Sequence, residues 1–352
     1  ISERLRSDIK GNDQGIKNAD RASSVIATTE GSLSEVSDLL NSIRALIVES
    51  ANTGANSAEE RKANQLQIDS AIDSITRISN TSSFGGLKLL NGSLDYNLSG
   101  LAATEISKAQ VFGASFIGAS NLKVDVDVLA SAQTGSLYIR GDYPATPAGN
   151  GTILSTTTLR VAGTKGVSEI TVISGSSMSD LVAAINNVTQ LTGVKAALIN
   201  SSDQTSGVVF QSTGYGSGEF VRVERLNAPA AGASPWQTYQ IAGNASVPSF
   251  GPPFDWATFL GNGTLTQSFK DDGRDVSALI NGTLATGEGL TVSVNSPSLS
   301  VKLLLAESFA TDPTLAVSNF YITGGGALFQ LGPQVTAQQQ TNLGIQSIAA
   351  SS

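Results

Sequence analysis

The chain has 352 residues, of which 40% are hydrophobic, and it contains neither cysteine nor histidine. These absences exclude disulfides, zinc–thiolate sites and thiol nucleophiles, and they remove the commonest general base and metal ligand. With 21 basic and 29 acidic residues, the chain also has no excess of positive charge with which to hold a nucleic acid or an anionic membrane. We therefore expect a globular protein with more than one domain that is not an enzyme, needs no cofactor and binds no nucleic acid.

The first part of the chain has the composition of solvated helices, because residues 1–83 carry 21 of the 50 charged side chains. Its apolar residues include five that follow one another at spacings of 3, 4, 3 and 4, namely Leu33, Val36, Leu40, Ile43 and Ile47. A heptad stripe of this kind predicts a helix that packs against another helix, as in a coiled coil. At 1.5 Å per residue, a helix over residues 1–50 would be about 75 Å long.

A second helix is predicted to begin at Ser57, because Ser57 and Glu60 have the spacing of a capping box. It should end near residue 80, and the short turn before it makes the two helices antiparallel. We expect the two helices to pack against each other or against neighbouring subunits through the following residues: Leu33, Val36, Leu40, Ile43, Ile47, Ile68, Ile72 and Ile75.

From residue 84 onward the sequence is rich in Gly, Ser, Thr, Val and Leu, which is typical of strands and turns. Apolar and polar residues alternate from Leu122 to Val128, as in a half-buried strand, and Asn91-Gly92 and Asn281-Gly282 predict type I′ hairpin turns. One helix interrupts this region, starting at Ser177 and burying Leu181 and Ile185. The predicted fold class is therefore α+β, with a long antiparallel helical shaft joined to a mainly β outer insertion domain that holds one short helix.

Two further segments carry candidate sites. Residues 226–263 hold five prolines and both tryptophans, Trp236 and Trp256, and are expected to form a long loop or small flap. The acidic run from Asp271 to Asp275 has some of the oxygen ligands of a calcium loop but lacks the spacing of an EF-hand. An acidic turn is therefore favoured there, and a metal ion at this turn is left open.

The helical segment resembles bacterial flagellin over about ninety residues. The shared motifs are Gln14-Gly15-Ile16-Lys17-Asn18-Ala19, Thr29-Glu30-Gly31-Ser32-Leu33 and the run from Asn80 to Gly92, which stand in the order that flagellins have them. A second stretch, from Ser177 to Asn187, looks like the insertion domain that many flagellins carry, and residues 284–292 and 324–332 resemble segments that lead back from that domain.

The resemblance implies an extracellular structural subunit of the bacterial flagellum that polymerises with copies of itself. It implies three parts: residues 1–120 as the helical shaft with a β-hairpin, residues 121–308 as the β-rich outer insertion domain, and residues 309–352 as the return segment. It also implies export without a cleaved signal peptide. Because the outermost helices of flagellins lie beyond residues 1 and 352 in this comparison, we expect this segment by itself to be a monomer.

The resemblance leaves a second function open, and it points to one recognition surface. The alternative is a cell-surface binding module of flagellin type, in which Trp236 and Trp256 would stack on a polysaccharide. The animal innate receptor that detects flagellin reads a helix face with the pattern Leu-Gln-Arg-x-Arg-Glu-Leu in the family. Here that face would present four residues, of which only Arg44 keeps the family pattern: Asn41, Ser42, Arg44 and Ala45.

Overall fold

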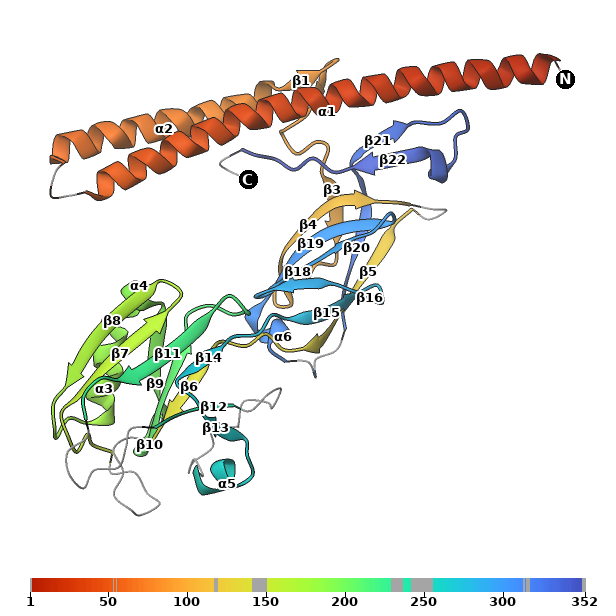
Figure 1. Cartoon of the computed structure of the whole chain (residues 1–352). Coiled ribbons are helices and arrows are strands. Elements are labelled where there is room, and N and C mark those ends of the chain that lie inside the picture. The colour runs from red at the N-terminus through yellow and green to blue at the C-terminus, as the bar shows by residue number, and fades with distance from the viewer. Residues whose placement is uncertain are drawn as a thin grey trace.

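The computed structural model describes residues 2–52, 54, 56–116, 120–140, 151–228, 237–241, 256–312, 314 and 317–349. The molecule is elongated, with a pair of long helices at one end, a β-sandwich in the middle and a second β domain at the far end (Figure 1). This arrangement confirms the predicted α+β class. No helix in the described part of the chain has the length and apolar character needed to cross a membrane.

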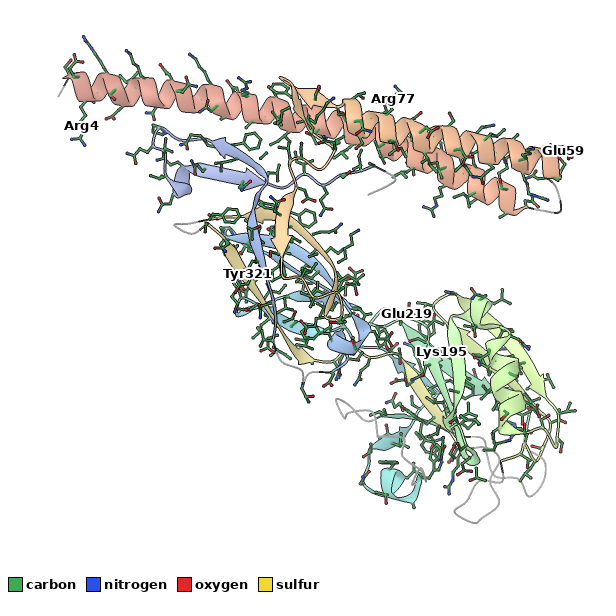
Figure 2. All side chains as sticks on the ribbon, turned by 180° about the vertical axis from the view of Figure 1, so that it is seen from behind. Arg4, Glu59, Arg77, Lys195, Glu219 and Tyr321 are labelled. Atoms are coloured by element: carbon green, nitrogen blue, oxygen red, sulfur yellow. The ribbon has the colours of Figure 1, made fainter. Side chains whose placement is uncertain are left out.

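The helical shaft consists of α1 (Ser2–Ala51) and α2 (Ala58–Thr81), as the heptad stripe predicted. α2 begins with the predicted capping box, in which the Ser57 hydroxyl accepts from the Glu60 N–H and the Glu60 carboxylate accepts from the Ser57 N–H. The helices run antiparallel, and Figure 2 shows Arg4 near one end of the shaft and Glu59 near the other. A small hairpin of β1 (Ser83–Phe84) and β2 (Leu87–Lys88) follows α2.

The middle sandwich is built from two antiparallel sheets. One sheet has the order β16-β15-β5-β20-β3 and the other has the order β17-β18-β19-β4. Their inward residues form one continuous core, in which Val124, Val126, Ala278 and Phe320 are fully buried. Its elements are β3 (Tyr96–Ser99), β4 (Ile106–Ala114), β5 (Leu122–Ala130), β15 (Ser277–Ile280), β16 (Thr283–Leu284), β17 (Thr286–Glu288), β18 (Thr291–Asn295), β19 (Leu299–Leu305), α6 (Glu307–Ala310) and β20 (Ser318–Gly325).

The far domain, here called the outer domain, has a separate core. Its two antiparallel sheets have the orders β13-β12-β6-β10-β9 and β14-β11-β7-β8, and α3 buries Leu181 and Ile185 as predicted. Its elements are β6 (Ser136–Ile139), β7 (Thr157–Gly163), β8 (Gly166–Val172), α3 (Met178–Asn186), α4 (Thr189–Thr192), β9 (Val194–Asn200), β10 (Asp203–Ser212), β11 (Phe220–Arg225), β12 (Thr238–Ile241), α5 (Trp256–Gly261), β13 (Leu265–Gln267) and β14 (Lys270–Asp272).

The chain then returns to the shaft as a hairpin of β21 (Ala327–Gln330) and β22 (Gln340–Leu343), with the 3-10 turn η1 (Ala337–Gln339) between them. Ala327, Phe329, Ile345 and Ile348 join the core that α1 and α2 share (Figure 1). The shaft core is therefore completed by residues more than 200 positions away from the helices in sequence.

The sandwich takes strands from both sides of the predicted domain boundaries at 120/121 and 308/309. β5 pairs with β15 on one side and with β20 on the other, and β20 also pairs with β3. Both predicted boundaries thus fall inside one hydrophobic core. Period-2 alternation marks the strands of this core but not which strands share a sheet, because strand pairing is set by tertiary contacts.

The two predicted type I′ turns have different outcomes. Asn281 (φ 48°) and Gly282 (φ 74°) both adopt positive φ and connect β15 to β16, which confirms the turn predicted at Asn281-Gly282. The second prediction, at Asn91-Gly92, is wrong, because only Gly92 has positive φ and the Asn91 carboxamide instead accepts from the Ser93 N–H. Leu89, Leu90 and Leu94 around this turn are buried in the shaft core. This segment therefore packs against the helices rather than forming a hairpin.

The described part of residues 226–263 is also more ordered than a loop or flap. It contains β12, which pairs with β6, and the short helix α5. Residues 229–236 and 242–255 lie outside the described residues. The outer domain therefore holds α4 and α5 in addition to the one helix that was predicted.

Candidate functional site

The heptad stripe of α1 is divided between two faces. Val36 is buried and Ile43 half-buried, and both pack in the shaft core with Ile75 and Ile78 of α2. A polar contact also joins the two helices, in which the Asn64 side chain of α2 donates to the Ser50 hydroxyl of α1 at 3.2 Å. Packing of α1 on α2 within one chain therefore uses only part of the predicted set.

The other part of the stripe faces away from α2. Leu33, Leu40 and Ile47 are exposed, Leu40 by 53% and Ile47 by 55%, and Ile26 extends the same seven-residue spacing. Positions three residues apart lie about 60° apart around a helix axis, so α2 covers the Val36 edge of the stripe and leaves the Leu33 edge bare. We call Ile26, Leu33, Leu40 and Ile47 the exposed stripe.

On α2 the predicted packing residues are divided in the same way. Ile75 is buried, Ile68 is half-buried, and Ile72 is exposed. Leu33, Leu40, Ile47 and Ile72 are therefore exposed within this chain, and their packing against a neighbouring subunit stays a prediction. A heptad pattern gives the direction of an apolar face but not the number of neighbours that cover it.

The N-terminal part of α1, which precedes its contact with α2, is covered by the return hairpin. The two come close at two glycines of α1, Gly11 and Gly15. An added Cβ at Gly15 would come within 2.9 Å of the Leu331 carbonyl oxygen, and one at Gly11 would come within 2.9 Å of the Pro333 Cβ. The glycines thus permit the loop after β21 to lie directly on the helix backbone. Leu328, Leu331 and Val335 of this hairpin remain exposed, next to the shaft.

The four residues of the predicted receptor face are all exposed on α1: Asn41, Ser42, Arg44 and Ala45. The Ser42 hydroxyl donates to the Asp38 carbonyl oxygen within the helix at 3.0 Å. Their side chains therefore leave the packing of α1 on α2 undisturbed, and their role in recognition stays a prediction.

The tryptophan prediction is wrong for Trp256. Its side chain is 4% exposed, packs with Tyr138, Ile199 and Leu265, and donates its indole N–H to the Ser206 carbonyl at 2.8 Å. A buried ring cannot stack on a sugar, so this residue provides core packing instead. Trp236 lies outside the described residues.

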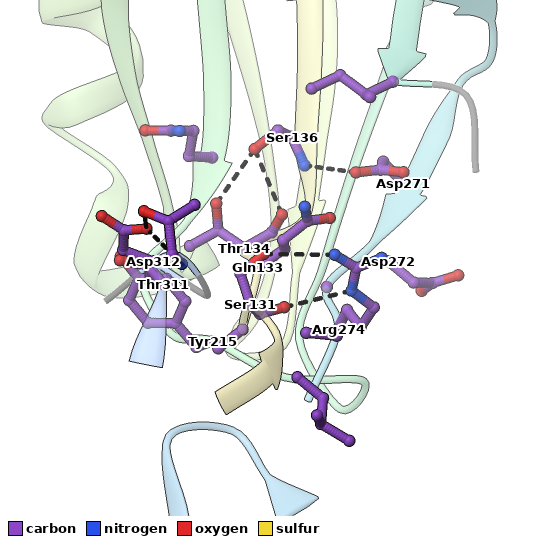
Figure 3. Close-up of a pocket in the computed structure, with 17 residues that line it drawn as sticks. Ser131, Gln133, Thr134, Ser136, Tyr215, Asp271, Asp272, Arg274, Thr311 and Asp312 are labelled. Carbon is purple, nitrogen blue, oxygen red and sulfur yellow. Dashed lines mark hydrogen bonds between the residues drawn. The ribbon is translucent and has the colours of Figure 1, made fainter. Parts of the chain in front are cut away.

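The acidic run lies at the junction of the sandwich and the outer domain, beside a cavity of about 990 Å³. Figure 3 shows Ser136 facing Asp271 and Arg274 beside Ser131 and Gln133. The Asp271 carboxylate accepts the Ser136 N–H at 2.7 Å, Asp272 pairs with Lys270, and Asp275 accepts from Ser217 and Gly289. Burial raises the pKa of Asp271 to about 6.

These carboxylates are directed at groups of the protein rather than at a common point. Within the described residues, no group of three or more acidic side chains is placed to hold a metal ion. Asp271 and Asp272 belong to β14, so this part of the acidic run is a strand and not the acidic turn expected from the sequence.

Two family descriptions match the chain. Residues 1–95 match the bacterial flagellin N-terminal helical region, and residues 158–214 match the flagellin hook IN motif. The first region covers α1 and α2, and the second lies in the outer domain and includes α3.

Several similar proteins are flagellins. Flagellin B of Vibrio anguillarum is 29% identical over 248 residues, which cover 66% of this chain and 63% of that protein. Flagellin B of Vibrio cholerae is 44% identical over 93 residues, which cover 26% of this chain and 24% of that protein. The chain thus spans less than two thirds of the length of these relatives.

Among solved structures, the D1-D2-D3 domains of the flagellar cap protein FliD from Escherichia coli show 16% identity and a TM-score of 0.36, covering 72% of this chain and 63% of that chain. The cap protein from Bdellovibrio bacteriovorus shows 12% identity and a TM-score of 0.34, covering 64% of this chain and 99% of that chain.

Proposed function

We infer that this chain, which is related to bacterial flagellin through its helical region and its hook IN motif, is a structural subunit of the flagellar filament. It would polymerise with copies of itself through the helical shaft, with the two β domains directed outward and exposed outside the cell. The observation that carries this proposal is the exposed stripe, an apolar face repeated every seven residues on a 50-residue helix. Such a face is suited to a helix of a neighbouring subunit.

The test replaces Leu33, Leu40 and Ile47 with serine in the full-length protein, in the cells that produce it. Because these side chains are exposed, the subunit should fold normally, while filaments seen by electron microscopy and swimming motility should be lost. The matched control replaces three exposed apolar residues of the β domains, Val167, Leu284 and Leu304, and should leave filaments intact. Normal filaments from the stripe variant would contradict the proposal.

We propose three structural units in place of the boundaries expected from the sequence. The shaft would comprise residues 2–94 with 327–348, the sandwich residues 96–130 with 276–325, and the outer domain residues 136–272. Separate hydrophobic cores in the three units support this division.

We also propose that residues 1–352 by themselves are a monomer. The exposed stripe is narrow, and stable protein–protein interfaces bury about 800 Å² on each partner. Sedimentation velocity should therefore give one species whose mass does not depend on concentration. A growing oligomer at higher concentration would contradict this.

Export is proposed to occur through the flagellum's own secretion channel without a cleaved signal peptide. A sequence free of cysteine is compatible with passage in an unfolded state. Deleting the flagellar export apparatus should abolish the surface appearance of the full-length protein. No enzymatic activity is proposed, in keeping with a sequence that has neither cysteine nor histidine.

For the innate receptor that detects flagellin, we propose weak or absent stimulation by this chain. Ser42 and Ala45 stand where the family pattern has Arg and Glu, and a charge-assisted hydrogen bond from such a side chain is typically worth about 1.5–3 kcal/mol. The double substitution Ser42→Arg with Ala45→Glu should raise stimulation in a receptor reporter assay. Stimulation by the unchanged protein at the potency of recognised flagellins would contradict the proposal.

A further inference from the structure

The sandwich and the outer domain are joined by two chain segments, residues 131–135 and 273–276. These segments form one antiparallel bridge, in which Gln133 N–H donates to the Arg274 carbonyl at 2.8 Å and Arg274 N–H donates back at 2.9 Å. A single bridge of this kind would allow the outer domain to twist or bend relative to the sandwich, because hinges are short segments that absorb φ and ψ changes.

A third segment crosses the same junction without being part of either connection. The loop of residues 213–219 lies between β10 and β11 of the outer domain, yet Tyr215 packs against the hydrophobic core of the sandwich. The Tyr215 hydroxyl donates to Glu307 of α6 at 2.6 Å. Next to it, Gly216 N–H donates to the Gln133 carbonyl at 3.2 Å.

Asp275 holds the end of this loop. Its carboxylate accepts from the Ser217 N–H at 3.0 Å, from the Ser217 hydroxyl and from the Gly289 N–H at 2.7 Å. Burial by itself would raise the pKa of Asp275, but these hydrogen bonds outweigh it and lower the pKa below its usual value. The charged form of Asp275 is therefore the form that the junction stabilises.

Two glycines let the loop and the sandwich come this close. At Gly216, which has φ +110°, an added Cβ would come within 2.6 Å of Asp275 Oδ1 and 2.8 Å of the Gly289 Cα. At Gly289, which has φ +60°, it would come within 2.9 Å of the Tyr215 carbonyl oxygen. A larger residue at either position would separate the two surfaces.

We propose that the loop of residues 213–219 is a latch that closes on Asp275 of the connecting segment and on Gly289 and Glu307 of the sandwich, and holds the outer domain in one orientation. With the latch closed, three segments cross the junction and bending is suppressed. With it open, the domains are joined through the two connecting segments, which the Gln133–Arg274 bridge and the hydrogen bonds from the Arg274 side chain to Ser131 hold together, and the outer domain can take several orientations. The proposal does not depend on filament assembly.

The test measures the distance between the two domains with spin labels. Because the sequence contains no cysteine, Lys195→Cys on β9 and Lys302→Cys on β19 place one label on each domain at exposed positions. With the latch intact, pulsed dipolar spectroscopy of the whole chain should give one narrow distance distribution. Tyr215→Phe combined with Asp275→Asn should broaden or split that distribution, and Gly216→Val should do the same.

The matched control is Tyr321→Phe combined with Asp203→Asn, because Tyr321 lies on the sandwich surface and the Asp203 carboxylate accepts from the N–H and hydroxyl of Thr205, two residues further along β10. It should leave the distribution unchanged. A broad distance distribution in the labelled chain without latch substitutions would overturn the proposal. A narrow distance distribution in latch variants whose circular dichroism spectra show that they are folded would overturn it as well. The single substitution Tyr215→Phe removes only a hydroxyl, so this variant should fold. It therefore tests the latch even if the other variants fail to fold.

Discussion

At the scale of single residues, Asp271 has the clearest consequence for stability. Its pKa is raised from 3.8 to about 6, mainly because burial disfavours the charged carboxylate. The hydrogen bond from the Ser136 N–H lowers the pKa but offsets only part of this rise. Between these two values the folded protein holds a proton that the unfolded chain releases. The contribution of Asp271 to stability is therefore fully present below pH 3.8 and is lost as the pH rises through 6.

Asp271→Asn should remove this pH dependence. Because the carboxylate is only partly buried, solvent screening reduces the expected contribution to about 1 kcal/mol. Urea unfolding at pH 5 and pH 7.5 should show that the variant gains stability relative to the parent as the pH rises. Asp203→Asn, at the start of β10 in the same domain, serves as the control. A constant difference between variant and parent at both pH values would contradict the prediction.

Trp256 shows why some residues of a candidate site could not be predicted from the sequence. A tryptophan in a segment rich in proline and glycine has no periodic neighbours from which its burial can be inferred. Its partners, Tyr138, Ile199 and Leu265, come from three separate strands. The exposure of Leu40 could not be predicted from the sequence for a related reason. A heptad pattern gives the direction of an apolar face but does not show which element covers it.

At the scale of elements, two glycines of α1 differ in what surrounds them. Gly31 has no atom within 4 Å of an added Cβ, whereas Gly15 has the Leu331 carbonyl oxygen at 2.9 Å. Gly31→Ala should therefore stabilise the protein by about 1 kcal/mol, the usual difference in helix propensity. Gly15→Ala should lack that gain, because the return hairpin must move away from the helix.

Equilibrium unfolding of the two variants gives the comparison, and hydrogen exchange of residues 327–343 localises the effect. Faster exchange in that hairpin is expected for Gly15→Ala only. Equal stabilisation by both substitutions, with unchanged exchange, would show that the hairpin does not depend on close approach at Gly15.

Elements with strong local signals were predicted well. The capping boxes at Ser57 and Ser177 fixed the starts of α2 and α3, because both partners of each cap lie within four residues. β19 was missed although Leu299, Val301, Leu303 and Leu305 alternate along it. The assignment of β19, β20 and β4 to one sandwich could not be inferred, because their pairings join residues about 200 positions apart.

At the scale of the whole molecule, the sandwich can close only after most of the chain is available. β5 pairs with β15 and β20, and β3 pairs with β20, whereas β9 and β10 of the outer domain are adjacent in sequence. Non-local pairings form more slowly because of loop-closure entropy. In pulse-labelled refolding, amides of β9 and β10 should be protected before those of β20. Simultaneous protection of all three would contradict this order.

The bridge between Gln133 and Arg274 has one more consequence. The outer domain leaves the sandwich and re-enters it at neighbouring positions, so its own length adds little to the separation that the sandwich strands must span. Insertions are tolerated best where both ends of the inserted segment lie close together at the surface. The sandwich and shaft can therefore accept an outer domain of a different size or fold, and a shorter linker in its place, as long as the ends of the replacement meet at this bridge.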